Sequence, residues 1–302
     1  MTIRYFIDLI YWIYKILFIY DYFISIVNLA IERRIRKVIT PRLAVCNIFG
    51  QDAGMLADFA HTHGFQGIDW SFDLGISRDD FLWKMHQLRE FEVRYHCFFY
   101  NVDLCYSDHR SYEAMNLFRK AIDFASSASG RHMTVHIGLG DHSDAELDWT
   151  KAIENLSELV SLGSDRGITV SLENIINAWT SNPKLFATLI KETGAGITFD
   201  IGHAHFCRKD DYDVYITPHQ DRVFNAHIYH TEIPRVGHIA PNGLDEIFDR
   251  LELLSFTPSC EWWVIELFQS DEILRTRNFL NQYIQHIQLS RQDFEQPAAF
   301  VR

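Results

Sequence analysis

The segment FDIGHAHF, residues 199–206, places an aspartate and two histidines directly after a short apolar stretch. Carboxylates and imidazoles bind divalent metals and transfer protons, so their combination at the end of such a stretch indicates one of these two kinds of chemistry. Three other apolar stretches end in the same chemistry. Two glutamates, one aspartate and one histidine would offer mostly oxygen ligands, a set suited to Mn²⁺, Mg²⁺, Co²⁺ or Zn²⁺: Glu173, Asp200, His227 and Glu266.

Eight short runs rich in β-branched and aromatic residues alternate along the chain with amphipathic stretches such as residues 114–125. Eight β-then-α units most simply close into an α/β fold of the (β/α)8 barrel type, a TIM barrel. A doubly wound open sheet is the alternative, but no G-x-G-x-x-G follows the first run. The predicted strands are 43–49, 67–72, 94–100, 132–138, 168–174, 196–202, 223–230 and 262–268.

In such a barrel the carboxyl ends of the strands build the active site, so the four candidate ligands are expected at one mouth. Taken singly, each has an ordinary structural explanation, as a helix cap or as a hydrogen-bonded core residue. Taken together, they would repel one another or stay unsatisfied without a cation. We therefore expect one bound divalent ion, with a hydrogen-bonded network as the alternative.

Composition limits the classes of function. The 302 residues indicate one main domain, expected at 41–302, behind an extension at 1–40. The five cysteines are scattered and form no C-x-x-C pair, which indicates neither a disulfide framework nor a zinc knuckle and favours a reducing cytoplasm. A formal charge of −12 argues against tight binding to nucleic acid. Association into a homo-oligomer stays open.

The extension is strongly apolar. Residues 5–31 are mostly apolar and aromatic, interrupted by Asp8, Lys15 and Asp21, and a basic segment follows at 33–37. The longest uncharged run is much shorter than the roughly 20 residues of a spanning helix. We expect an apolar helix that lies on a membrane surface through residues 1–37, or packs on the bottom of the barrel. An upstream extension from a misplaced start codon is a third reading.

Several motifs carry a resemblance to a known family. SLENI, FDIGHAH, AHIYH, GHIAPNGLDEIF and VIELF, within residues 42–290, resemble the xylose isomerase-like TIM barrels, which include sugar isomerases, ketose 3-epimerases, hydroxypyruvate isomerase and endonuclease IV. The resemblance implies that Glu173, Asp200, His227 and Glu266 bind one divalent metal. It also implies that Glu173 and Glu266 are the acid/base pair.

Four further histidines match histidines that hold two additional zinc ions in the endonuclease IV branch: His96, His136, His203 and His238. That branch has an aspartate where this chain has Val236, so the resemblance leaves a multi-metal site incomplete. We expect the four histidines to contact substrate or to hold the metal ligands in place. Asp69 stands where relatives usually carry glutamate.

Aromatic residues and one arginine complete the expected pocket. Trp70 and Trp179 could stack on a sugar ring, although core packing is their commoner role, and Arg235 could meet an anionic group. The expected function is a metal-dependent sugar isomerase or epimerase that transfers a proton next to a carbonyl through an enediolate. The alternatives are a phosphodiester hydrolase of the endonuclease IV type and a membrane-tethered binding protein with a degenerate site. A carbohydrate is the expected partner in the first case.

Overall fold

The computed structural model describes residues 40–50, 52–72, 75–99, 102–139, 146–206 and 214–295. Eight parallel strands close into a barrel in the order β1-β10-β7-β6-β5-β4-β3-β2. All eight strands predicted from the sequence are confirmed, and each ends one to three residues earlier than predicted. They are β1 Arg42–Cys46, β2 Gly67–Ser71, β3 Glu92–Cys97, β4 His132–Val135, β5 Thr169–Glu173, β6 Gly196–Asp200, β7 Val223–Ile228 and β10 Trp262–Ile265.

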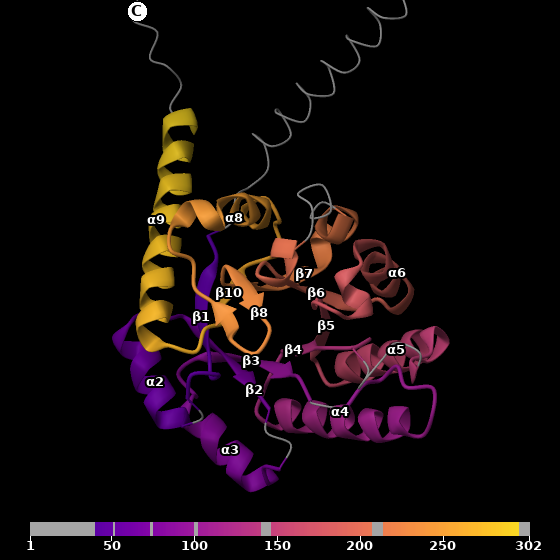
Figure 1. Cartoon of the computed structure of the whole chain (residues 1–302). Coiled ribbons are helices and arrows are strands. Elements are labelled where there is room, and N and C mark those ends of the chain that lie inside the picture. The colour runs from indigo at the N-terminus through magenta and orange to yellow at the C-terminus, as the bar shows by residue number, and fades with distance from the viewer. Residues whose placement is uncertain are drawn as a thin grey trace, which may run out of the picture. The chain divides into compact units, whose positions relative to one another are not determined.

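Helices surround the strands, so the TIM barrel architecture is confirmed (Figure 1). The main helices are α2 Ala53–Thr62, α3 Arg78–Gln87, α4 Arg110–Ser127, α5 Trp149–Asp165, α6 Pro183–Thr193, α8 Phe248–Ser255 and α9 Ser270–Glu295. Short 3-10 helices are η2 Trp179–Ser181, η3 His203–Phe206, η4 Thr217–Arg222 and η5 Leu244–Glu246. Buried residues of α4, among them Phe118, Ala121 and Ile122, form the predicted apolar face.

Local signals fix where the helices begin and end. The side chains of Asp52, Ser77 and Asp148 accept backbone N–H groups in the first turns of α2, α3 and α5. Asn182 does the same for α6, which begins with a proline and ends at Gly194 with φ +72°. Such caps satisfy backbone groups that the helix itself leaves unpaired, so the βα connections have defined positions.

The amino end of the barrel is filled by an indole ring. Trp262 begins β10, and a methyl group added to Gly67, the first residue of β2, would lie 2.0 Å from that ring. The guanidinium of Arg94 lies 4.4 Å from the centre of the Trp262 ring. In the middle of the barrel, the hydroxyl groups of Thr134 and Thr198 are 2.7 Å apart. The candidate ligands therefore lie above a packed interior, at the carboxyl ends of the strands.

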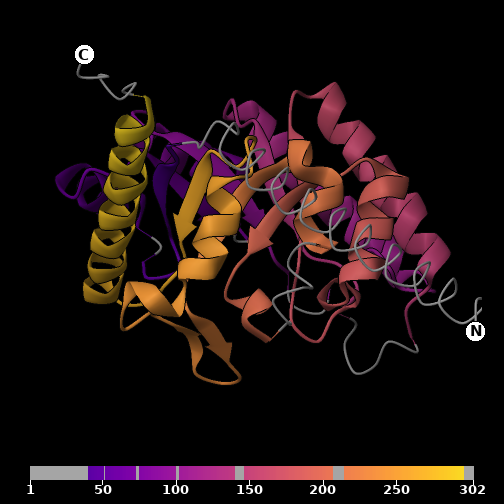
Figure 2. The ribbon, with the colours of Figure 1, turned by 90° about the horizontal axis from the view of Figure 1, so that it is seen from above.

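A small hairpin that the sequence did not predict follows β7. Its strands β8 Thr231–Ile233 and β9 Gly237–Ile239 pair antiparallel. In Figure 2 the hairpin, drawn in orange, projects beyond the barrel strands. Its turn contains Pro234, and Arg235 with φ +67°, and the N–H of Val236 donates to the carbonyl of Ile233 at 2.9 Å. These features are those of a type II turn.

The apolar extension predicted at residues 1–40 lies outside the described residues, except for Thr40. Among the helices that the structure describes, none is long and apolar enough to cross a membrane. Four of the five cysteines are described, and each is a buried free thiol: Cys46, Cys97, Cys105 and Cys260.

Candidate metal centre

The four residues predicted as metal ligands lie together at the mouth of the barrel, and we call them the central cluster: Glu173, Asp200, His227 and Glu266. Glu173 and Asp200 end β5 and β6, His227 lies in β7 opposite Asp200, and Glu266 follows β10. Nδ1 of His227 lies 3.0 Å from Oε2 of Glu266, 3.3 Å from Oε2 of Glu173 and 3.6 Å from Oδ2 of Asp200. Three carboxylates therefore converge on one imidazole nitrogen.

The central cluster fits a divalent cation. All four residues are buried, and Oδ2 of Asp200 and both ring nitrogens of His227 have no hydrogen-bond partner. Buried polar groups without partners are rare in folded proteins, and one explanation for them is an ion. Three carboxylates and one imidazole are the ligand types expected for Mn²⁺, Mg²⁺, Co²⁺ or Zn²⁺.

The carboxylates and histidines of the central cluster shift one another's pKa values. Burial opposes ionisation of both glutamates, but His227 and the other neighbouring histidines hold the pKa of Glu173 and of Glu266 well below the ordinary value. Burial likewise opposes the charged form of His227, but Glu173 and Glu266 raise its pKa well above the usual range. Each side of the cluster therefore favours the charged form of the other. A cation that binds Nδ1 would have to displace any proton on that nitrogen.

His96 and His136 also contact the central cluster. Their Nε2 atoms lie 2.8 Å apart, and Nε2 of His136 lies 3.0 Å from Oε2 of Glu173. Nδ1 of His96 lies 3.4 Å from Oε1 of Glu266. The two histidines thus contact both predicted acid/base residues.

A second group contains a residue that the sequence analysis missed. His203 and His238 lie beside Glu232 of β8, and these three residues are the hairpin cluster. Nε2 of His203 is 3.0 Å from Oε2 of Glu232. Nδ1 of His203 lies 2.9 Å from the carbonyl of Asn174, and Nδ1 of His238 lies 2.8 Å from the carbonyl of Glu266. Both rings are therefore fixed through Nδ1, and Nε2 of His203 faces Glu232.

Glu232 changes the conclusion drawn from Val236. Val236 lies exposed in the hairpin turn and is 64% exposed, so it does not contribute to the site. A carboxylate is nonetheless present beside the two histidines, because Glu232 pairs directly with His238 across the hairpin. The hairpin therefore brings an acidic group to the two histidines from position 232 and not from position 236. The signal that could have found it is a glutamate between His230 and His238, close to the end of the seventh strand.

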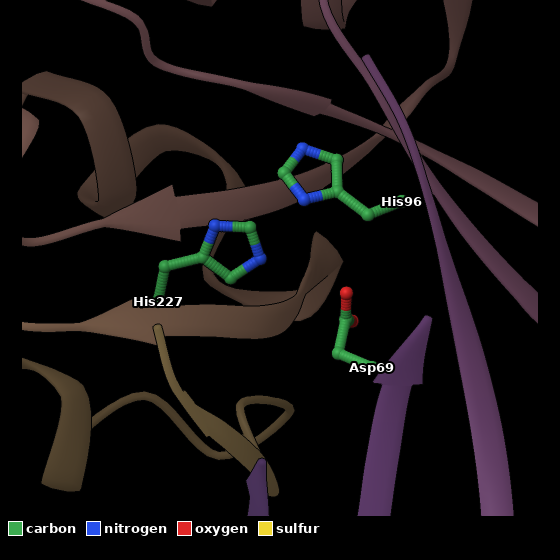
Figure 3. A group of neighbouring side chains, drawn as sticks. All are labelled: Asp69, His96 and His227. Atoms are coloured by element: carbon green, nitrogen blue, oxygen red, sulfur yellow. The ribbon is translucent and has the colours of Figure 1, made fainter. Parts of the chain in front are cut away.

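Asp69 belongs to the same mouth. One of its carboxylate oxygens lies within 4.8 Å of ring nitrogens of His96 and His227. Figure 3 shows the carboxylate and the two rings turned toward one small space. Asp69 is buried, which raises its pKa, although His227 and His96 act in the opposite direction.

Trp70, Trp179 and Arg235 lie apart from the central cluster. Trp70 packs in the core, the commoner of the two roles considered for it: neighbouring strand residues face opposite sides, and because Asp69 faces inward Trp70 faces outward. Its ring is buried, with Nζ of Lys84 of α3 5.5 Å from the ring centre. Trp179 is half-buried and packs on Trp149 at 5.4 Å between ring centres. Arg235 is exposed in the turn of the hairpin.

A cavity of about 450 Å³ adjoins the hairpin cluster through His203. Its wall includes Asn174, Ile175, Tyr215 and Pro234. A small polar molecule would fit a space of this size.

The fold and the order of the ligand residues define the class to which the protein belongs. Residues 57–283 match the family described as Xylose isomerase-like TIM barrel, so the chain is a member of that family and the resemblance read from its motifs is confirmed.

Individual relatives agree with this assignment. An uncharacterized protein of Methanocaldococcus jannaschii is 31% identical over 157 residues, which are 51% of this chain and 67% of that protein. An L-ribulose 3-epimerase structure superposes with a TM-score of 0.67 at 12% identity and covers 86% of this chain and 99% of its own. The IOLI protein with a bound zinc atom superposes with a TM-score of 0.62 at 14% identity, over 80% of this chain and 97% of its own. At these identities the two structures show a common fold.

Proposed function

We propose that the protein is a metal-dependent sugar isomerase or epimerase. The observation that carries the proposal is the central cluster, in which three buried carboxylates meet one imidazole nitrogen at distances of 3.0 to 3.6 Å. The family and the structural neighbour named L-ribulose 3-epimerase support a ketose as the substrate class.

Glu173, Asp200, His227 and Glu266 would hold one divalent ion. When bound, the ion would supply positive charge beside the substrate oxygen that becomes negative as the neighbouring C–H loses its proton. The proton itself moves through the chain's own carboxylates. Glu173 and Glu266 belong to strands that β6 and β7 separate in the barrel, so they approach a ligand on the barrel axis from different sides.

This placement supports a two-base proton transfer. One glutamate removes the proton from the carbon next to the carbonyl, and the other returns a proton to the opposite face, which inverts that carbon. If one glutamate performs both steps, the product is an aldose–ketose isomer. His96 lies 3.3 Å from Glu173 and 3.4 Å from Glu266, which suits a residue that contacts the substrate or holds both carboxylates in place.

Solvent exchange tests the proposal. The Mn²⁺-loaded protein is incubated in D2O with ketoses, beginning with L-ribulose, and the recovered sugars are analysed by NMR. Deuterium on the carbon next to the carbonyl is the expected result, because a proton on a carboxylate exchanges with water. Product without deuterium would indicate a hydride shift, and absence of both product and exchange with every ketose would contradict the proposal.

The hairpin cluster favours a second candidate, a metal-dependent phosphodiester hydrolase. In that cluster Nδ1 of each histidine lies within hydrogen-bonding distance of a backbone carbonyl, an arrangement typical of metal-binding histidines, and Nε2 of His203 faces Glu232, with which it could share a metal. His96 and His136 could bind a further ion together with Glu173. Metal analysis separates the candidates: one ion per chain supports the isomerase, and two or three support the hydrolase.

A further inference from the structure

Asp69 is a buried acid without a partner. It is 1% exposed, and neither of its carboxylate oxygens accepts a hydrogen bond. A buried carboxylate in this state is unfavourable unless a cation or a hydrogen-bond donor compensates it. The surroundings of Asp69 therefore indicate what it does.

Two imidazole rings are its polar neighbours. The carboxylate of Asp69 points to the space between His96 and His227 (Figure 3), with the nearest donor and acceptor atoms within 4.8 Å of one another. Both nitrogens of His96 already have neighbours: Nε2 lies 2.8 Å from His136, and Nδ1 lies 3.4 Å from Glu266. His227 is different, because its Nε2 has no hydrogen-bond partner.

The two nitrogens of His227 face different surroundings. Nδ1 faces the three carboxylates of the central cluster, at 3.0 to 3.6 Å. Nε2, on the other side of the ring, is turned toward Asp69 (Figure 3). A neutral imidazole carries one N–H, and the acceptor that it meets decides which nitrogen carries it.

We propose that Asp69 is a positioning residue that accepts a hydrogen bond from Nε2–H of His227, directly or through one water, and so leaves Nδ1 free for the divalent ion. The inference rests on the proposed metal centre. A small movement or a single water closes a separation of this size. The interaction also orients the ring, because an imidazole held at Nε2 cannot turn Nδ1 away from the three carboxylates.

The test measures metal binding and the proton itself, without a substrate. Dissociation constants for Co²⁺ are measured for the wild type, Asp69→Asn and Asp69→Ala. Loss of such a partner typically weakens metal binding about 10–100-fold. We expect that loss for Asp69→Ala and a smaller one for Asp69→Asn, whose amide oxygen can still accept a hydrogen bond from Nε2–H. In the Zn²⁺-loaded protein, NMR should show a slowly exchanging Nε2–H signal from His227 that Asp69→Ala removes.

Asp103→Ala is the matched control. Asp103 is also buried, but its oxygens accept the backbone N–H groups of Cys105 and Leu139 at 2.9 and 2.8 Å. Its replacement should lower thermal stability and leave Co²⁺ affinity within about twofold. Asp69→Asn should behave in the opposite way, with unchanged stability of the metal-free protein, because no hydrogen bond is lost.

Four outcomes would overturn the inference. Wild-type Co²⁺ affinity in Asp69→Ala would contradict it, as would an unchanged Nε2–H signal. A loss of one whole ion per chain in Asp69→Ala would show that Asp69 is itself a metal ligand. A wild type that takes up no divalent ion would instead overturn the metal centre, and the inference with it.

Discussion

Nε2 of His203 lies 3.0 Å from Oε2 of Glu232, while Nδ1 of the same ring lies 2.9 Å from the carbonyl oxygen of Asn174. The ring is thus held between the loop after β5 and the hairpin after β7. His203 also lies 3.4 Å from carboxylate oxygens of both Glu173 and Asp200. A residue of the hairpin therefore reaches the central cluster through one histidine.

The first prediction concerns Glu232. If it orients His203 and does not bind an ion, Glu232→Gln should leave one metal per chain and lower turnover about tenfold. Metal content by mass spectrometry and initial rates are the measurements. Glu92→Gln is the control, because Glu92 pairs with Arg42 at the amino end of the barrel. If Glu232→Gln lost one ion per chain and Glu92→Gln lost none, Glu232 would itself bind an ion, which would favour the hydrolase.

The second prediction concerns the ligands without an acid/base role. Asp200→Ala and His227→Ala should each remove the metal and abolish activity together, since each removes one of four donors from the central cluster. Metal content and activity are measured on the same preparation. His132→Ala serves as the control, because His132 is a buried barrel histidine that contacts Ser171 at 2.8 Å. Full metal content in Asp200→Ala would remove Asp200 from the ligand set.

The third prediction separates chemistry from binding. Glu173→Gln and Glu266→Gln should each lower product formation on the order of 10²-fold or more, because an amide does not accept the substrate proton. Most of the metal binding should remain, since the amide oxygen can still coordinate. Turnover in D2O and metal content are the two readouts. If either variant kept wild-type turnover, that glutamate would not be part of the acid/base pair.

The fourth prediction concerns pH. In the metal-free protein the pKa of His227 is raised, so its charge stabilises the fold below the unfolded pKa of about 6.5, and this stability is lost as pH rises through the folded pKa. Thermal unfolding of metal-free protein should show this decline above neutral pH. Metal-loaded protein should not show it, because its His227 is already neutral.

The fifth prediction concerns the competition between a proton on His227 and the divalent ion. Metal affinity should therefore fall as pH is lowered, because the raised pKa of His227 must be overcome before Nδ1 can bind. Titrations with Co²⁺ at several pH values measure this dependence. Affinity that does not change with pH would show that no proton leaves the central cluster on binding.

The sequence predicted the barrel because each strand is a short apolar run with a defined end. It placed Glu173, Asp200, His227 and Glu266 together for the same reason, since all parallel strands of a barrel end at one mouth. For Trp70 the sequence left two roles open, stacking on a sugar ring and core packing, and the strand pattern could have decided between them. The alternation of side chains along a strand requires Asp69 and Trp70 to face opposite sides.

Glu232 could not be placed by the same reasoning. It lies in a hairpin outside the barrel, and its direction depends on the turn at Pro234–Val236 and on the pairing of β8 with β9. Neither follows from apolar periodicity. The burial of Asp69 beside His96 and His227 could not be predicted either, because these two histidines belong to strands distant from it in the sequence.

Whether the number of residues in the hairpin turn is odd or even decides which side chains of β8 and β9 share a face. Glu232 and His238 are paired across β8 and β9, so their side chains share one face. Inserting one residue into the turn would shift the register by one and turn one of the two side chains to the opposite face. Inserting two would restore the facing pair. Among related proteins, this loop should therefore differ by even numbers of residues wherever both side chains are retained.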